Sequence, residues 1–396
     1  MSYELKQLGF DNIEAKTNHH LSGVLESNNV SSANTLLTIC GNARHIPLRD
    51  SCIDLILTSP PYWRKKDYGI TNQIGQERTP NEYIDSLIEV LKECRRVLRP
   101  LGAVFINIGD TYYKKSLIDI PGLLAAAARK DNWIIRNKIV WAKDSGKPEP
   151  VKNRLVNRHE YIYHLTVNTK YYYDLFGYSV KYGNGSNPGD VWLLGTSSNN
   201  SDHPAPFPEE LVERILTLAC PKEVCSSCNR PRRRIVRRTT QLDTTRPQAR
   251  RAMQIARAAG LTEQHIAAIQ ATGISDAGKG KRFQIGSGRN SAEVMRLATE
   301  AKQVLRGYFR EFACARKESL GWTDCHCGKG FITGAVLDPF AGTGTVLRVA
   351  KRFGLSGVGI DLNPESCREI SEDLKGKELL DKVFSNNVTQ PLLVGI

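Results

Sequence analysis

The six residues from Thr58 to Trp63, TSPPYW, are the part of the chain whose types and spacing most clearly suggest chemistry. They follow the apolar run 52–57, so they lie at the carboxyl end of a predicted strand, the edge at which open α/β sheets bind ligands. Two consecutive prolines make a rigid turn without N–H donors, which leaves carbonyl oxygens and the Ser59 hydroxyl to accept hydrogen bonds from an amino group. Tyr62 and Trp63 add flat rings for stacking. This combination suits an enzyme that grips the exocyclic NH2 of a flipped nucleobase.

The run resembles the catalytic motif of DNA amino-methyltransferases, which move a methyl group from S-adenosylmethionine to cytosine N4 or adenine N6. Near the other end of the chain, Val336–Thr345 (VLDPFAGTGT) resembles the cofactor-binding loop of these enzymes. A catalytic motif that precedes the cofactor loop resembles the permuted beta class, of which the cytosine-N4 methylases of restriction-modification systems are typical. The resemblance covers residues 36–221 and 333–375.

The resemblance assigns catalysis to Ser59, Pro60, Pro61 and Tyr62. Hydrogen bonds from the target amine to Ser59 and to the Pro60 carbonyl would aim the nitrogen lone pair at the methyl group, and no covalent intermediate is needed. A serine at the first position of the tetrapeptide goes mostly with cytosine N4 in this family, with adenine N6 as the alternative. The alternative to a catalytic motif is that TSPPYW is only a proline-stiffened surface turn.

The cofactor loop has its own physical logic, because Gly342 and Gly344 let backbone approach a ligand and the next helix offers free N–H groups. Asp361 ends the following strand, where a carboxylate can bind ribose hydroxyls. The alternatives are a nicotinamide site for the segment and a helix cap for Asp361. The predicted cofactor residues are Asn42, Thr58, Asp338, Phe340, Gly342, Gly344, Thr345 and Asp361; family members often have Asp at the position of Asn42.

Apolar runs and helical spacing predict a doubly wound, mostly parallel sheet. The predicted strands cover residues 36–40, 53–57, 103–108, 133–141, 159–167, 335–337 and 356–360, with 159–167 antiparallel to its predecessor. The predicted helices cover residues 81–98, 120–129, 209–219 and 346–353. This is an α/β, Rossmann-like methyltransferase fold of seven strands in circularly permuted order.

Composition agrees with a DNA enzyme. The formal charge of +14 and the pI near 9.3 favour a polyanionic partner, and no apolar run is long enough to span a membrane. The amino terminus does not have the pattern of a secretion signal, so the ten cysteines are expected to be thiols or metal ligands. We therefore expect a cytoplasmic protein of a prokaryote or phage, bound to nucleoid DNA.

Residues 153–161 resemble the family segment after the sixth strand. Arg154 and Arg158 could contact phosphates, and His159 and Glu160 could lie beside the base pocket, although a solvated loop is the alternative. Residues 171–174 and 203–208 complete the resemblance.

A stretch of about a hundred residues separates the two matching parts. We expect three regions: a catalytic half (1–221), an insertion (222–332) and a cofactor-binding half (333–396). The insertion opens with Cys225 and Cys228 and closes with Cys325 and Cys327, a pattern typical of a zinc ribbon that staples its ends together. Free thiols are the alternative, and Cys220 and His326 are reserve ligands.

The inserted region is basic and is predicted to be helical. Residues 248–259 and 262–272 have the outline of a helix-turn-helix around Gly260, and 291–312 is predicted to be one long helix. Lysines and arginines at 279–282 and 286–290 suggest basic loops. We expect the insertion to read the target sequence, with a solvated basic face as the alternative. The predicted DNA-binding residues are Trp63, Arg154, Arg158, His159, Arg232, Arg233, Arg234, Arg237 and Arg238.

The expected partners are double-stranded DNA and a cognate restriction endonuclease. Two other functions stay open: an inactive, zinc-dependent DNA-binding protein on the same fold, and a methylase of protein or RNA amides.

Overall fold

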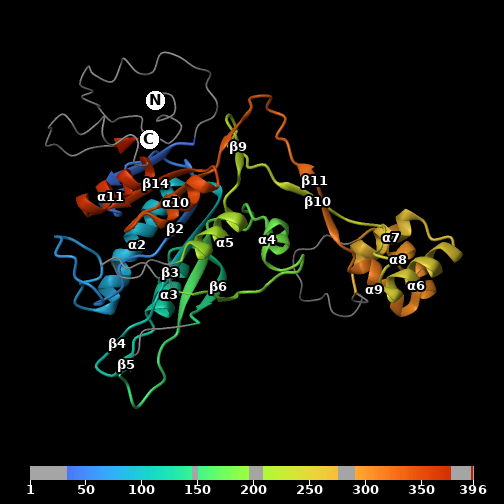
Figure 1. Ribbon diagram of the computed structural model, residues 1–396, viewed down its shortest axis with the longest axis horizontal. Coiled ribbons are helices and arrows are strands. Elements are labelled where there is room, and N and C mark those ends of the chain that lie inside the picture. The colour runs from blue at the N-terminus through green and yellow to red at the C-terminus, as the bar shows by residue number, and fades with distance from the viewer. Residues whose placement is uncertain (1–33, 145–149, 196–207, 275–289, 376–393, 396) are drawn as a thin grey trace. The chain divides into compact units, whose positions relative to one another are not determined.

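The computed structural model describes residues 34–144, 150–195, 208–274, 290–375 and 394–395. Of the segments named above, residues 203–207, 279–282 and 286–289 lie outside these residues. The chain divides into two compact units (Figure 1). The first, here called the α/β unit, contains Met1–Arg233 and Asp324–Ile396, and the second, the helical unit, contains Arg234–Thr323.

A sheet of nine strands forms the centre of the α/β unit, in the order β15-β1-β14-β13-β2-β3-β7-β6-β8. The strands are β1 (Leu36–Cys40), β2 (Ile53–Thr58), β3 (Leu98–Ile108), β6 (Ile134–Ala142), β7 (His159–Thr166), β8 (Val191–Leu193), β13 (Ala335–Asp338), β14 (Ser356–Asp361) and β15 (Val394–Gly395). The pairs from β1 to β3 are parallel, and β7 is antiparallel to both of its neighbours, as predicted for residues 159–167. The prediction of seven strands was wrong, because β8 and β15 extend the two edges with pairings of three and two residues.

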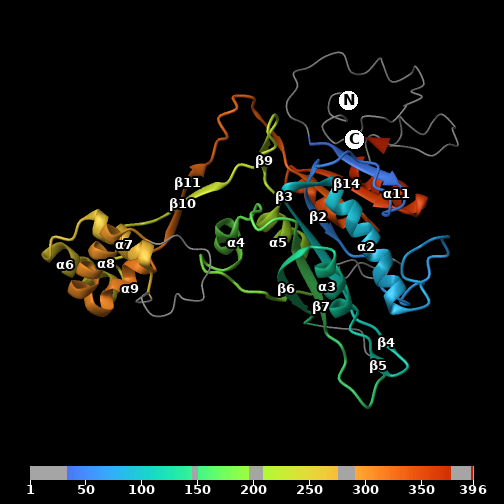
Figure 2. The same ribbon diagram turned by 180° about the vertical axis from the view of Figure 1, so that it is seen from behind.

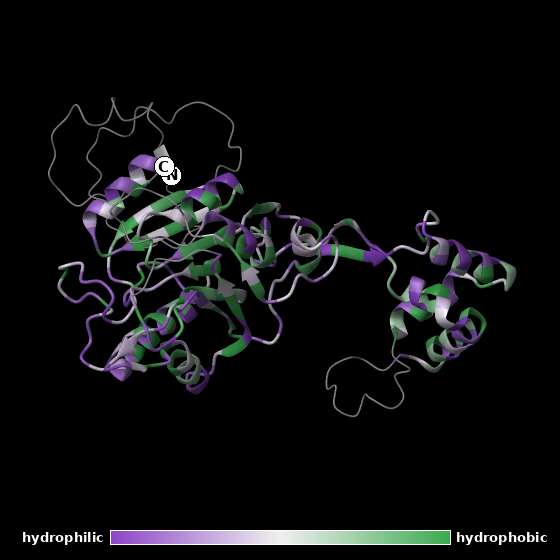
Figure 3. Ribbon diagram, turned by 60° about the horizontal axis from the view of Figure 1, so that its bottom comes forward, coloured by the Kyte–Doolittle hydropathy of each residue, from purple (hydrophilic) through white to green (hydrophobic). Residues whose placement is uncertain are grey.

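The central strands are buried because helices cover the sheet. All six residues of β2 are buried, which explains the continuous apolar run instead of an alternating one. Figure 3 shows the same pattern as hydrophobic strands inside more hydrophilic helices.

Helices pack on both faces of the sheet (Figures 1 and 2). Helices α2 (Pro80–Val97) and α3 (Ile120–Lys130) contribute to the core of one face. Helices α4 (Leu175–Tyr182), α5 (Glu209–Ala219), α10 (Thr345–Arg352) and α11 (Pro364–Lys375) contribute to the core of the other. The start of α2 follows local rules, since Thr79 and Glu82 form a capping box around Pro80.

The position of β13 between β14 and β2 matters most for a site. Parallel strands end at the same edge, so the TSPPYW turn after β2 and the glycine loop after β13 are brought together. The contact between Thr58 and Asp338 spans 280 positions of sequence.

In the part of the chain that the structure describes, three two-stranded pairings lie outside the large sheet. They join β4 (Tyr112–Tyr113) to β5 (Ser116–Leu117), β9 (Glu223–Cys225) to β12 (Phe331–Thr333), and β10 (Arg234–Arg238) to β11 (Lys317–Trp322).

The helical unit has its own small core. Helices α6 (Pro247–Ala258), α7 (Glu263–Thr272), α8 (Ala292–Leu305) and α9 (Phe309–Ala313) bury mainly alanine, isoleucine, leucine and phenylalanine. The helix pair predicted around Gly260 is confirmed. The single helix predicted over 291–312 was wrong, because the chain turns at Arg306, whose φ is +49°, beside the poor helix former Gly307. Within the described residues, no helix combines the length and hydrophobicity needed to cross a membrane.

Candidate active site

The carboxyl ends of β1, β14, β13 and β2 meet at one edge of the sheet. There the Thr58 hydroxyl donates to Asp338 Oδ1 at 2.6 Å, and the Gly342 N–H donates to Asp361 Oδ2 at 2.8 Å. The N–H of Gly41 donates to the backbone oxygen of Asp361 at 2.9 Å, which places Asn42 at the same edge. The structure therefore gathers the residues predicted from both ends of the sequence.

Gly344 is fixed by conformation and by space. Its φ is +75°, and a Cβ at this position would lie 2.9 Å from two side-chain carbons of Ile370. Gly344 is also the N-cap of α10, whose first N–H groups have no partner within the helix. An anionic or polar ligand group can therefore approach this helix end closely.

Asp338 is a buried residue that holds the start of the glycine loop in place. It is 2% exposed and accepts hydrogen bonds from the Thr58 hydroxyl and from the Phe340 N–H at 3.0 Å. Burial raises the pKa of Asp338 to about 7. Its carboxyl group ties β13 to β2, whereas Asp361 is partly accessible.

The TSPPYW turn presents a serine and a tyrosine. The Ser59 hydroxyl lies 3.3 Å from the Tyr62 hydroxyl, and both residues are partly accessible. The Tyr83 hydroxyl donates to the Pro61 carbonyl at 2.9 Å. Pro60 is buried, and among the described residues nothing donates to its carbonyl.

Three donors converge on Glu160 beside this turn. Its carboxylate accepts from the Tyr62 hydroxyl at 2.6 Å, the Asn107 side-chain amide at 2.7 Å and Lys143 Nζ at 2.5 Å. Burial, and next the charge of Glu160, raise the pKa of Tyr62 well above its ordinary value. Tyr62 is therefore a protonated donor to a carboxylate whose charge Lys143 balances.

Asn107 and Lys143 are absent from the predicted site residues, whereas Glu160 was expected beside the base pocket. The register explains their meeting, since β7 pairs with β3 on one side and with β6 on the other. One signal was visible: Asn107 is the only polar residue in the apolar run 103–108. Its carbonyl Oδ1 is buried without a hydrogen-bond partner in the described structure, although its amide is fully engaged beside Ser59.

The prediction that Trp63 stacks on DNA was wrong. Trp63 is 1% exposed, and its Nε1 donates to the Glu77 carbonyl at 3.0 Å. The ring packs edge-on against Tyr113, with centroids 5.6 Å apart. The chain turns inward after Tyr62, so this tryptophan anchors the turn as part of the core.

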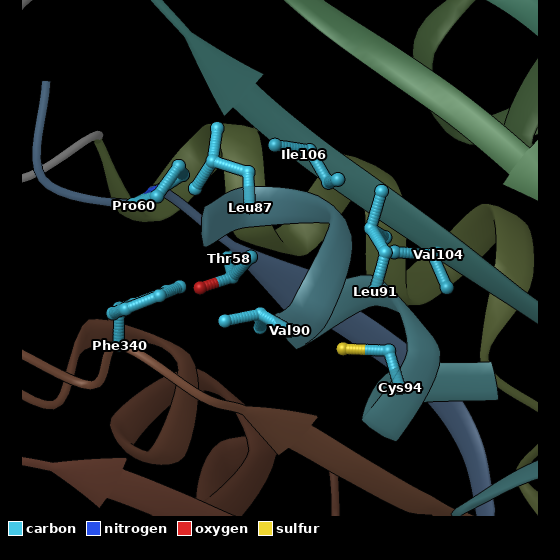
Figure 4. A pocket seen from close by; sticks show the side chains of 9 residues that line it. All are labelled: Thr58, Pro60, Leu87, Val90, Leu91, Cys94, Val104, Ile106 and Phe340. Carbon is cyan, nitrogen blue, oxygen red and sulfur yellow. The ribbon is translucent and has the colours of Figure 1, made fainter. Parts of the chain in front are cut away.

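A small cavity lies behind the turn (Figure 4). Thr58, Pro60 and Phe340 line it together with side chains of α2 and β3, and its volume is ≈ 20 Å³. That is close to the size of one water molecule, so it is a packing gap and not a ligand pocket.

Three other predicted DNA-binding residues lie in or just before β7. Arg158 is exposed, the Arg154 guanidinium lies 3.8 Å from the centre of the Tyr112 ring, and His159 Nε2 lies 3.0 Å from the Tyr161 hydroxyl.

The arginines of the basic run have partners of their own. Arg232 pairs with Glu223 at 2.8 Å and Arg237 with Glu318 at 3.1 Å. Arg233 donates to the Tyr171 carbonyl, Arg234 lies over Trp322 and Arg238 donates to the Ala313 carbonyl.

The four predicted metal ligands do come together. The sulfur atoms of Cys225, Cys228, Cys325 and Cys327 all lie within 4.8 Å of one another. The two reserve ligands, Cys220 and His326, are not part of this group.

The model of the DNA methylase family matches residues 53–224 and 331–372, more than half of the chain. The matched parts contain the TSPPYW turn, Glu160 and the glycine loop. They leave out 225–330, which contains the four cysteines and the helical unit.

Relatives are Type II methyltransferases. M.Cfr9I of Citrobacter freundii is 35% identical over 196 residues, which are 42% of this chain and 65% of that protein, just under two thirds of its length. M.SmaI of Serratia marcescens is 33% identical over 216 residues, which are 46% of this chain and 74% of that protein.

Among solved structures, the cytosine-N4-specific PvuII DNA methyltransferase superposes over 90% of this chain and 89% of its own, with a TM-score of 0.48 and 14% identity. The family match covers most of the α/β unit and both halves of the candidate site. The chain therefore belongs to the DNA methylase family.

Proposed function

We propose that the chain methylates an exocyclic amino group of duplex DNA with S-adenosylmethionine, as the modification enzyme of a restriction-modification system. The observation that carries the proposal is the juxtaposition of Ser59 and Tyr62 with the glycine loop, through the bond between Thr58 and Asp338. The sequence order, with β2 before β13, supports a circularly permuted form of the fold.

The residues at the sheet edge fit the cofactor. Three features suit a ligand with a carboxylate and a ribose. Gly344 has a left-handed conformation at a position where a side chain would clash, and the N-terminus of α10 follows it. The carboxylate of Asp361 is partly accessible. When bound, S-adenosylmethionine supplies an activated methyl group. Asn42, Phe340, Gly342, Thr345 and Asp361 would surround it. The four clustered cysteines take no part in the transfer.

Ser59 and Pro60 prepare the amine. The Ser59 hydroxyl and the Pro60 carbonyl can each accept one N–H of the target, which localises the lone pair on nitrogen and orients it. Because the prolines fix this turn, little reorganisation is needed when the base enters.

A chain of hydrogen bonds can remove the proton that the methylated amine must lose. That proton passes to Ser59 Oγ, the Ser59 proton passes to Tyr62 Oη, and the Tyr62 proton passes to Glu160, which becomes a neutral carboxylic acid. Lys143 stabilises the carboxylate before the transfer, and Asn107 holds both Tyr62 and Glu160 in place.

The target that we propose is cytosine N4, and its support is Ser59 as the first residue of the tetrapeptide. Adenine N6 is the alternative, because both bases present an amino group beside a ring nitrogen.

Mass spectrometry of nucleosides tests the activity and the target together. Mixed-sequence duplex DNA is incubated with the protein and S-adenosylmethionine and then digested. N4-methylcytosine supports the whole proposal, and N6-methyladenine overturns the choice of base. Ser59→Ala should abolish the product while binding of S-adenosylmethionine is retained. Absence of any methylated base with the unmodified protein, despite DNA binding, would support an inactive DNA-binding protein.

We also propose that the helical unit supplies DNA contacts outside the catalytic site. Helix α6 has Arg250, Arg251 and Arg257 on its exposed surface and no acidic residue, whereas α7 has neither lysine nor arginine. Within the described part of the chain, Arg251 and Arg257 form no ion pair. This distribution favours α6 over α7 and over the engaged arginines of β10 for phosphate contacts.

A further inference from the structure

The four clustered cysteines come from two turns that face each other in the α/β unit. Cys225 ends β9 and Cys228 lies in the turn that follows, while Cys325 and Cys327 precede β12. β9 and β12 are paired antiparallel, with Phe331 opposite Cys225, so the pairing holds one turn against the other.

The distances suit a tetrahedral metal ion. Zinc binds thiolate sulfur at about 2.3 Å, which places the sulfurs of a tetrahedral site about 3.8 Å apart. The sulfur atoms here lie within 4.8 Å of one another, so a small inward movement of the side chains completes the tetrahedron. Four sulfur ligands are the donor set of structural zinc sites.

The backbone of the first turn is shaped as a sulfur cradle. The N–H groups of Ser227 and Cys228 point at Cys225 Sγ, at 3.4 and 3.5 Å. Asn229 closes the turn in the left-handed region, with φ of +55°, and its N–H donates to the Cys225 carbonyl at 3.0 Å. Donors directed at sulfur stabilise the thiolate form, which is the form that binds metal. This second observation does not depend on the number of cysteines.

The cluster lies next to the strand that carries the glycine loop. β12 ends at Thr333, whose hydroxyl lies 2.8 Å from that of Ser356 in β14. β13 begins at Ala335, and its N–H donates to Asp54 of β2 at 2.9 Å. Only Gly334 separates the two strands, and its N–H bonds the Lys222 carbonyl beside β9.

We infer that Cys225, Cys228, Cys325 and Cys327 form a tetrathiolate zinc site that fixes the amino-terminal end of β13. The helical unit begins at Arg234 and ends at Thr323, so the chain leaves and re-enters the α/β unit at this site. A metal cross-link there holds β12, and through it β13, in register although about a hundred residues intervene in sequence. This inference does not rest on methyl transfer.

Metal analysis of the purified full-length protein tests the site. We expect about one zinc ion per chain, released by a mercurial reagent that modifies these thiols. The double variant Cys225→Ser/Cys327→Ser should lose the zinc. The matched control is Cys314→Ser, since Cys314 is exposed and lies in the helical unit, outside the cluster. It should keep the full zinc content.

Hydrogen exchange tests the role of the metal in the unmodified protein. Removal of zinc with a strong chelator under reducing conditions should accelerate exchange at residues 223–225 and 331–338, and re-addition should reverse the change. A protein that is folded by circular dichroism but contains no zinc overturns the inference. So does resistance of the four thiols to alkylation in the protein denatured with a chelator but without reductant, as two disulfides would give. Zinc that persists in the double variant also overturns it.

Discussion

At the scale of single residues, Glu160 is the hydrogen-bond acceptor that positions the polar side chains of the candidate site. A carboxylate that accepts three hydrogen bonds at 2.5–2.7 Å holds each donor in one position. Tyr62, held by Glu160, in turn contacts Ser59, the residue expected to touch the target amine.

Replacement of the Tyr62 hydroxyl should interrupt proton removal and leave the ring in place. We expect Tyr62→Phe to lower the rate of methylation by about 10²–10⁴-fold, the usual contribution of a positioned acid or base. Single-turnover kinetics measures this rate, and equilibrium binding of S-adenosylmethionine serves as the control, since it should not change. A variant as fast as the parent would exclude the hydroxyl chain as the path of the proton.

The burial of His164 predicts that the folded protein loses stability in acid. This side chain is fully buried between the rings of Phe105 and Tyr173, and both ring nitrogens lack partners among the described residues. Burial, and next the charge of Arg136, lower its pKa from 6.5 to about 3. Below pH 6.5 His164 is protonated in the unfolded chain but stays neutral in the folded protein. The free energy of unfolding therefore falls as the pH falls.

His164→Phe should remove this dependence while it preserves the stack. Since one pKa unit corresponds to about 1.4 kcal/mol, we expect the variant to gain about 2 kcal/mol over the parent on going from pH 8 to pH 5. Urea unfolding at the two pH values measures the difference, with the exposed His45→Gln as control. Parallel pH profiles for parent and His164→Phe would contradict the prediction.

At the scale of elements, the glycine loop and α10 form one unit with α11. Ile370 of α11 packs where a side chain at position 344 would project, which closes the loop from behind.

Gly344→Ala should therefore damage cofactor binding more than its size suggests. The new Cβ meets Ile370 at 2.9 Å and needs a positive φ, which together cost roughly 1–3 kcal/mol. We expect calorimetry to show S-adenosylmethionine binding weaker by roughly 5- to 150-fold. Gly307→Ala is the matched control, because open space surrounds that position and its φ is not positive. Equal affinity in both variants would show that the loop does not bind the cofactor.

At the scale of the whole molecule, the family match and the division into units agree in part. The matched residues lie within the α/β unit, and the helical unit lies within the unmatched stretch. This supports chemistry in the α/β unit and target contacts in the helical unit, both as proposals.

Arginine variants can test the second of these roles. We expect Arg251→Ser/Arg257→Ser to weaken DNA binding, and to reduce the dependence of log K on log salt by about 0.9 for each lost phosphate contact. The control is Arg237→Ser/Arg296→Ser, whose guanidinium groups already pair with glutamates. A larger loss in the control would shift the contact surface to β10 and α8, which contain Arg237 and Arg296. Unchanged DNA affinity in both variants would contradict the proposal that the helical unit binds DNA.

The sequence by itself determined the parts of this protein that depend on neighbours along the chain. The turn after β2, the glycine loop and helices such as α2 follow from runs of apolar residues, prolines, glycines and caps, and their predicted bounds agree with the structure to within a residue or two. Only the tertiary structure decided which side chains meet. Glu160 contacts Tyr62 because β7 lies antiparallel beside β3 in one register, and Trp63 is buried because the chain turns inward after Tyr62. Register and chain direction depend on the packing of the whole sheet, which no local pattern encodes.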